Sequence, residues 1–250
     1  MEPERAIGIG AGTKNSAFEM AIQRPPDSTF HQDIFPRLGQ WTHLTSPGKA
    51  GRLMRGVVEV WVCQVLAEGF PVHWVDGACR MDPSRLLKIL NQMGVSSDEC
   101  LSRLYVSRGF TLHQLVRQIE RLPVEMALTG SPFVFLDGWL MMHSDEQVGD
   151  RESRLLFRHK CSILKQMQEK QPRILISSGD SRFRTKREHA LQRMQRAHTT
   201  NRLHGCLVGP KNAQKLKLYH EKTNQTGYWM HDKSTTLHHF THDLNIMNNR

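Results

Sequence analysis

The chain has 250 residues, 38% of them apolar, and 34 Lys and Arg against 24 Asp and Glu give a formal net charge of +10. This length suits one large domain, and the strong local apolar runs exclude a wholly disordered protein. The five scattered cysteines contain no C-x-x-C pair, which excludes a disulfide framework and a cysteine-based zinc site. No apolar run approaches the roughly 18 residues of a membrane span, so we expect no membrane association. The positive net charge favours a partner with negative charge.

The first half of the chain alternates between helical and strand patterns. Residues 1–30 are rich in Gly, Pro and polar types and predict an irregular lead-in. Apolar residues then recur at three- and four-residue steps between 49 and 66, which predicts one helix. A short strand is expected at 72–76. Asp82 and Pro83 form an N-cap and a first helical residue, and they predict a second helix that ends before Gly94.

The same alternation continues through the second half of the chain. The predicted elements are a strand at 104–107, a helix from the Thr111 cap through Leu122, a strand at 133–137, a helix at about 150–169 and a strand at 173–177. Strands that alternate with long helices predict an α/β fold with a mostly parallel sheet and helices on both faces. Residues 202–208 and 214–219 flank a Gly-Pro turn and predict a C-terminal antiparallel hairpin.

A degenerate phosphate-binding loop begins the first predicted helix. In such a loop, glycines wrap the phosphates, a lysine reaches the outer phosphates and a hydroxyl holds magnesium. The stretch 43–51 keeps only the Gly-Lys pair, because His43 replaces the first glycine and Ala50 replaces the hydroxyl residue. The position at a helix N-terminus favours anions, although Gly-Lys pairs also occur by chance in loops. The predicted nucleotide-binding residues here are Ser46, Gly48, Lys49, Ala50 and Gly51.

Asp137 is the second candidate residue of this site. It ends the apolar strand at 133–137, where the magnesium-water aspartate of nucleotide-binding α/β folds is found. A structural alternative is that Asp137 only caps the turn at Gly138. We expect Lys49 and Asp137 to lie side by side at the carboxyl edge of the sheet.

Three further segments, in order, resemble the RecA/RadA recombinase family. They are Val75-Asp76-Gly77-Ala78 with Met81-Asp82-Pro83-Ser84-Arg85-Leu86, the stretch 104–115 (LYVSRGFTLHQL), and the stretch 197–203 (AHTTNRL). The resemblance covers about residues 10–225 and implies a RecA-like P-loop core at 31–230, with a flexible polar tail at 231–250. It also implies ATP as the nucleotide.

Compared with that family, the chain lacks several groups that hydrolysis requires. The glutamate that activates the attacking water falls at Ala78 or Gly77, and the sensor glutamine falls at Gly179. The hydroxyl missing at Ala50 is a third loss. Each of the three losses removes about 2–4 kcal/mol of transition-state stabilisation. We therefore expect ATP binding with magnesium held weakly or not at all, no catalytic residue and negligible turnover.

A basic segment follows the sensor strand, where the resemblance places a mobile loop in the DNA channel. Residues 180–198 contain cations and one aromatic side chain that suit phosphate contact and base stacking. The alternative is an ordinary solvated helix face. The predicted DNA-binding residues are Arg182, Phe183, Arg184, Lys186, Arg187, Arg193 and Arg196. The other candidate loop, 140–150, is acidic at its far end, and this suggests weaker DNA engagement.

Two further patterns are weaker. Phe18 and Ala21 fit the Phe-x-x-Ala pattern by which such recombinases dock onto a neighbour, although core packing is the alternative. The histidines His231, His238, His239 and His242 lack a complete set of ligands, so we expect no metal site.

The function that these features favour is that of an accessory recombinase paralogue in homologous-recombination DNA repair. Its expected partners are a recombinase or another paralogue, in a heteromer, and single-stranded DNA. One alternative is a divergent RecA-fold DNA-dependent ATPase whose base is Asp76, Glu120 or another carboxylate that the sequence does not identify. Another is a pure protein-interaction module. The resemblance implies a nuclear protein in a eukaryote and a cytoplasmic one in an archaeon.

Overall fold

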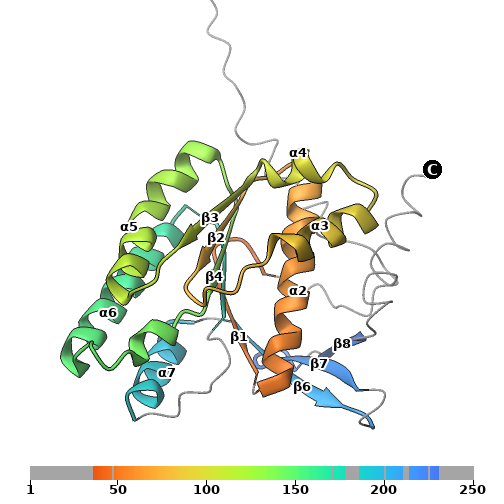
Figure 1. Ribbon diagram of the computed structural model, residues 1–250. Coiled ribbons are helices and arrows are strands. Elements are labelled where there is room, and N and C mark those ends of the chain that lie inside the picture. Colours follow the sequence, from red (N-terminus) through yellow and green to blue (C-terminus); the bar gives the residue numbers. More distant parts are fainter. Residues whose placement is uncertain are drawn as a thin grey trace, which may run out of the picture.

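The computed structural model describes residues 36–46, 48–170, 172–177, 186–199, 201–210, 214–224 and 226–230. Within them, eight strands form one sheet in the order β3-β2-β4-β5-β1-β6-β7-β8 (Figure 1). The strands are β1 (Trp41–Thr45), β2 (Val72–Asp76), β3 (Leu104–Arg108), β4 (Phe133–Asp137), β5 (Arg173–Ser177), β6 (Asn201–Val208), β7 (Lys215–His220) and β8 (Thr226–Met230). The pairings from β3 to β6 are parallel, and β7 pairs antiparallel with both β6 and β8. The prediction of an α/β fold with a mostly parallel sheet and a C-terminal antiparallel hairpin is confirmed.

Helices cover both faces of the sheet, as predicted. They are α2 (Gly48–Ala67), α3 (Pro83–Gln92), α4 (Ser97–Leu101), α5 (Leu112–Thr129), the 3-10 helix η2 (Met141–Ser144), α6 (Asp150–Gln168) and α7 (Lys186–His198). Figure 1 shows α2, α3 and α4 on one side of the sheet and α5, α6 and α7 on the other. Strand β4 serves both cores, since Phe133 and Phe135 pack with α2 whereas Val134 and Leu136 pack with α5 and α6.

Local signals fix the starts of two helices as the sequence predicts. The Asp82 carboxylate accepts a hydrogen bond from Ser84 N at 3.0 Å, and the Thr111 hydroxyl accepts one from Gln114 N at 3.2 Å. Both side chains thus satisfy backbone donors that a helix N-terminus leaves free. These caps place α3 and α5 directly after the loops that follow β2 and β3.

The predicted end of the third long helix at Leu122 is wrong. Helix α5 continues through Pro123 to Thr129, and Gly130 ends it with a φ of 67°. Proline removes one helical hydrogen bond, but the buried side chains Leu122 and Met126 on either side of it pack into the core. Tertiary packing therefore outweighs the local signal.

Part of the segment predicted as a mobile loop is helical. Residues 186–198 form α7, and Leu191 and Gln195 are buried on its inner face. The other elements that the sequence does not predict are β1, β8, α4 and the 3-10 helix η2. Strand β1 has the polar sequence Trp-Thr-His-Leu-Thr, and it is a central strand because β5 and β6 pair with it on either side.

Candidate functional site

The carboxyl ends of the parallel strands bring several predicted site residues to one edge of the sheet. Asp76 at the end of β2 and Asp137 at the end of β4 are direct register partners. Ser177 ends β5, and Gly48 follows β1 after a short turn. Neighbouring strands lie about 4.8 Å apart, so the turn after β1 is two strand spacings from Asp137. This edge is where open α/β sheets bind ligands.

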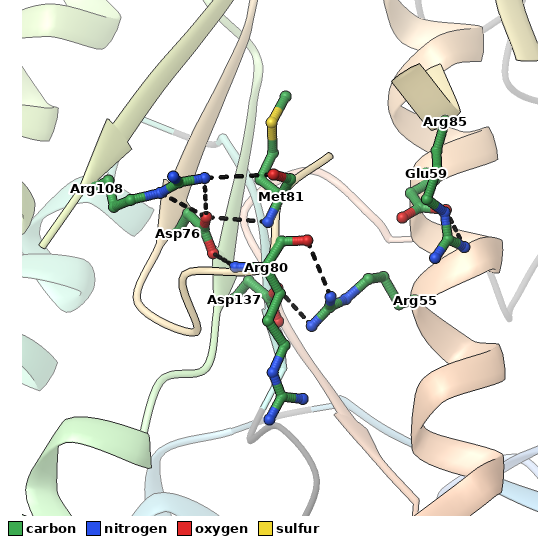
Figure 2. A network of polar contacts seen from close by, with 8 residues as sticks. All are labelled: Arg55, Glu59, Asp76, Arg80, Met81, Arg85, Arg108 and Asp137. Atoms are coloured by element: carbon green, nitrogen blue, oxygen red, sulfur yellow. Dashed lines mark hydrogen bonds and ion pairs between the residues drawn. The ribbon is translucent and has the colours of Figure 1, made fainter. Parts of the chain in front are cut away.

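Asp76 is fully buried, and its carboxylate is held by backbone donors and by an arginine. Its carboxylate accepts hydrogen bonds from the backbone N–H groups of Arg80 and Met81, each at 3.0 Å. The Arg108 guanidinium of β3 adds an ion pair at 2.8 Å (Figure 2). Charge-assisted bonds of this kind hold the loop after β2 in place. The Asp76 carboxylate is thus a structural anchor.

Asp137 pairs with an arginine that the sequence did not single out. Arg55 of α2 places Nη2 at 3.1 Å from Asp137 Oδ2, and the two side chains are 15% and 1% exposed. Arg55 Nη1 also donates to the Arg80 carbonyl oxygen at 3.2 Å, as Figure 2 shows. Burial raises the pKa of Asp137, while the Arg55 cation opposes that rise and the neighbouring Asp76 adds to it. We call Arg55, Asp76, Arg108 and Asp137 the carboxylate cluster.

The position of the missing glutamate is filled by backbone packing. Ala78 is 8% exposed, and a Cβ atom at Gly138 would lie 2.6 Å from the Ala78 backbone nitrogen. Gly77 N also donates to the Asp137 carbonyl oxygen at 2.9 Å. The turns after β2 and β4 are therefore in van der Waals contact. A side chain at Gly138 would clash with the turn after β2, and one at Gly77 would press against the Asp137 carbonyl oxygen.

Beyond the carboxylate cluster, α2 carries a second buried carboxylate. Glu59 pairs with Arg85 of α3 at 2.7 Å, and its side chain is 3% exposed. Burial raises the pKa of Glu59 from 4.5 to about 7, although Arg85 and Arg55 act in the opposite direction. Figure 2 shows this pair near the cluster, with Glu59 on the same helix as Arg55 and Arg85 on α3.

The N-terminus of α2 is open by comparison. Gly48 has a φ of 48°, and a Cβ atom added there would meet nothing within 4 Å. Lys49 is exposed, and its Nζ donates to Gln214 Oε1 at 3.1 Å. Ala50 is buried, and Ser46 Oγ donates to the Thr45 carbonyl at 2.7 Å and to Met54 Sδ. The exposed lysine and glycine are thus the groups that a phosphate can reach.

The structure does not bring Lys49 and Asp137 into contact. Their interactions lie elsewhere, Lys49 with Gln214 and Asp137 with Arg55. Six residues of helix separate Lys49 from Arg55, which corresponds to about 9 Å along the helix axis. Arg55 therefore reaches the end of β4, whereas Lys49 stays at the start of the helix. The expectation that the two predicted residues lie side by side is wrong.

These residues do not fit a magnesium ion. In nucleotide sites of this kind the metal needs a hydroxyl at the start of the helix and an accessible aspartate. Ala50 has no hydroxyl, and the Asp137 carboxylate already faces the Arg55 guanidinium. In the described part of the chain, no group of three or more His, Cys, Asp or Glu side chains is arranged to hold a metal.

The predicted DNA-binding residues fall into three groups, which are exposed residues of α7, the partly buried Arg187, and residues outside the described part of the chain. Lys186, Arg193 and Arg196 are exposed on α7, at spacings that place them on one helix face. Arg187 instead binds the segment after β4. Its Nη1 donates to the carbonyl oxygens of His143 at 3.1 Å and Asp145 at 3.0 Å, and its Nε pairs with Asp150. Arg187 thus joins α7 to the acidic loop.

Other predictions concern residues outside the described part of the chain. These are Arg182, Phe183 and Arg184 of the basic segment, Phe18 and Ala21 of the docking pattern, Gly179, the four late histidines, the lead-in at 1–30 and the tail at 231–250. Among the helices that are described, none has a stretch both apolar enough and long enough to cross a bilayer.

No protein-family model matches this sequence, and no curated protein is significantly similar to it.

Proposed function

We propose that this chain is an accessory paralogue of the RecA/RadA-type recombinases that binds a nucleotide and hydrolyses it negligibly. The observation that carries this proposal is the contrast along one sheet edge. Lys49 is exposed at the start of α2, while Asp137 is sealed against Arg55. A site of this form can bind phosphates, but the described residues at this edge offer no accessible carboxylate to activate water.

The order of the strands supports a RecA-like P-loop core. Strand β5, which the resemblance assigns to the sensor, lies between β1 and β4. At the carboxyl edge, Ser177 therefore lies between the Gly48-Lys49 turn and Asp137. A sensor residue would need this position beside the phosphate-binding turn. Ser177 also donates a hydrogen bond to Asp137, so the sensor strand and the aspartate are linked.

The alternative of an active ATPase loses support from its two candidate bases. Asp76 is fully buried and holds Arg108 together with two backbone N–H groups. Glu120 lies on α5, where it pairs with Arg117 at 3.1 Å and with His159 at 2.7 Å. Neither carboxylate is free to take a proton from water at the start of α2.

Nucleotide binding that does not require magnesium tests the proposal. The Arg55 guanidinium already neutralises Asp137, so the protein has no use for a metal at that carboxylate. We expect ATP to bind equally well, within about twofold, in magnesium and in EDTA, as measured by isothermal titration calorimetry. ATP hydrolysis should stay at the rate of a protein-free sample.

A matched pair of variants makes this test specific. Lys49→Ala should abolish the calorimetric signal, whereas Lys88→Ala, at an exposed position of α3, should leave it unchanged. ATP turnover by the wild type at rates typical of active recombinases would contradict the proposal. So would binding that disappears in EDTA, because it would show that a metal is held at this edge.

The proposed partners follow from the resemblance and from the charge of the chain. The exposed cations Lys186, Arg193 and Arg196 on α7 favour contact with a phosphate backbone. Co-purification from host cells followed by mass spectrometry should recover a recombinase or another paralogue. Recovery of neither would contradict the proposed role in homologous recombination.

One observation favours the alternative that the chain is a pure protein-interaction module. Helix α5 exposes Val124 and Leu128, which are 63% and 83% accessible and lie one helical turn apart. Exposed apolar side chains on one face suit protein contact. A chain that binds neither ATP nor single-stranded DNA, but still forms a heteromer, would establish this alternative.

A further inference from the structure

The C-terminal strands have one apolar and one basic face. Leu203 of β6 and Leu216 and Leu218 of β7 pack into the core beneath α2. Because side chains alternate along a strand, the residues between them point to the opposite face. That face carries Arg202 and His204 on β6, and Lys215, Lys217 and Tyr219 on β7.

These side chains lie side by side and are reached by solvent. Lys217 is the register partner of Cys206, and Tyr219 is the partner of His204. Lys215 and Cys206 are exposed, while the side chains of Arg202 and His204 are 28% and 37% exposed. The cations of two neighbouring strands, about 4.8 Å apart, therefore form one patch. We call Arg202, His204, Lys215, Lys217 and Tyr219 the basic sheet face.

Helix α7 adjoins the basic sheet face. His198, the last residue of α7, has its ring 6.3 Å from the ring of Trp41 on β1. His43 on the same face of β1 is buried, and burial together with the nearby His204, Arg202 and Arg196 lowers its pKa to about 3. Arg196 of α7 and Arg202 of β6 thus both act on the same buried imidazole, and the end of α7 lies beside β1, which pairs with β6.

The charged side chains of this surface favour an anionic ligand. Glu221, at the end of β7, pairs with Arg202 at 2.8 Å and with His204 at 3.3 Å. Lys215 and Lys217 remain free of described ion pairs. Tyr219 hydrogen-bonds through its hydroxyl to Asn224 Oδ1, which positions the ring among the cations. Positive groups interleaved with an aromatic ring are the pattern of surfaces that bind single-stranded nucleic acid.

We infer that the basic sheet face, which lies beside the end of α7, is a second contact surface for single-stranded nucleic acid. This inference rests on the proposed nucleic-acid binding and extends it to residues outside the basic segment. The phosphates would lie against Lys215 and Lys217, and one base would stack on Tyr219. Binding across α7 and the sheet would need no sequence readout.

Fluorescence anisotropy with a fluorescein-labelled oligothymidylate tests the inference in the full chain. The sheet variant is Lys215→Gln with Lys217→Gln. The helix variant is Arg193→Gln with Arg196→Gln. The matched control is Arg117→Gln with Arg121→Gln, which removes the same charge from α5, where both side chains are highly exposed. Circular dichroism melts verify that each variant is folded.

The salt dependence of binding gives the quantitative outcome. Each phosphate contact on a single strand contributes about 0.7 to the slope of log affinity against log salt, so the sheet variant should lose about 1.4. The control should lose nothing. A sheet variant that matches the control while the helix variant weakens would overturn this inference and keep the proposed function. If the wild type does not bind the oligonucleotide, both fail.

Discussion

Along the carboxyl edge of the sheet, the charged side chains are buried and paired at one place and exposed at another. At the ends of β2 and β4, Asp76 and Asp137 are buried and each is paired with an arginine at about 3 Å. At the start of α2, Lys49 is exposed and holds only the side-chain oxygen of Gln214. Buried charges are costly unless they are paired, whereas an exposed lysine is stable without a partner.

This difference teaches which part of the edge is available for ligands. The carboxylate cluster has already been neutralised by groups of the protein, so a ligand or metal would have to displace an arginine. The α2 N-terminus presents a glycine and a lysine to solvent, and a phosphate would replace only one exposed hydrogen bond. The exposed lysine and the buried, paired carboxylates thus lie at different places along one edge of the sheet.

The largest expected effect comes from removing an arginine of the carboxylate cluster. Arg55→Ala leaves the Asp137 carboxylate buried without its cation, and it also removes the bond to the Arg80 carbonyl oxygen. We expect the free energy of unfolding to decrease by about 3–5 kcal/mol. Urea denaturation followed by circular dichroism measures this loss.

A double variant separates the pair from simple packing. Replacing both partners, as Arg55→Met with Asp137→Leu, removes the buried charges together and should cost less than Arg55→Ala alone. If the single and double variants lose the same stability, the ion pair is not what holds this end of the sheet. The comparison between the two ends would then fail.

The fold was more predictable from the sequence than the cluster was. Residues 133–136 form a continuous apolar run, which a strand covered on both faces requires, and the cap at Asp82 has its own local signal. Strand β1 carries no such signal, because its Thr42 and His43 have polar side chains, although both are buried. Pairing with β5 and β6 is a non-local property that no short window contains.

The second prediction concerns the glutamate that the resemblance places at Ala78. Ala78→Glu should not restore hydrolysis, because the turn after β2 packs directly on Gly138. We expect turnover to stay at background and the free energy of unfolding to decrease by about 2 kcal/mol through overpacking and burial of a charge. Cys79→Glu is the control, since Cys79 is exposed. An Ala78→Glu variant that hydrolyses ATP would show that the site is intact.

The residues of the cluster illustrate why the candidate site was only partly predictable. Asp137 stands at the end of an apolar strand, so its position alone identified it. Arg55 occupies a helix in which arginine is common on solvated faces, and only the packing of α2 across the sheet turns it toward Asp137. Likewise, Arg187 sits in a basic run but binds backbone carbonyl oxygens of the loop after β4. Side-chain direction, rather than residue type, decides these roles.

The third prediction concerns the pH dependence of stability, which reports on the buried Glu59 in the middle of α2. Burial raises the pKa of Glu59 to about 7 in the folded chain, whereas the ordinary pKa of a glutamate is 4.5. Between these values the folded chain keeps a proton that the unfolded chain releases, so stability falls as pH rises from 4.5 to about 7. We expect a contribution of about 1–3 kcal/mol that Glu59→Gln removes.

A carboxylate with the opposite shift is the control for this experiment. His159 and Arg117 hold the pKa of Glu120 below its usual value, so its contribution is present at higher pH and is lost on acidification. Glu120→Gln should therefore leave the slope between pH 4.5 and 7 unchanged. Equal slopes for the wild type and Glu59→Gln would mean that Glu59 is ionised throughout this range in the folded chain.

The smallest expected effect is at the open end, where one exposed hydrogen bond competes with a ligand. Gln214→Ala frees the Lys49 ammonium from its only described partner, a contact at 3.1 Å. An exposed bond of this kind is worth about 0.5 kcal/mol, so ATP affinity should rise by about twofold with no change in stability. Calorimetry on Gln214→Ala, and on the same change combined with Lys49→Ala, measures the difference. A gain that persists without the lysine would show that Gln214 acts elsewhere, and the open end would then need another phosphate ligand.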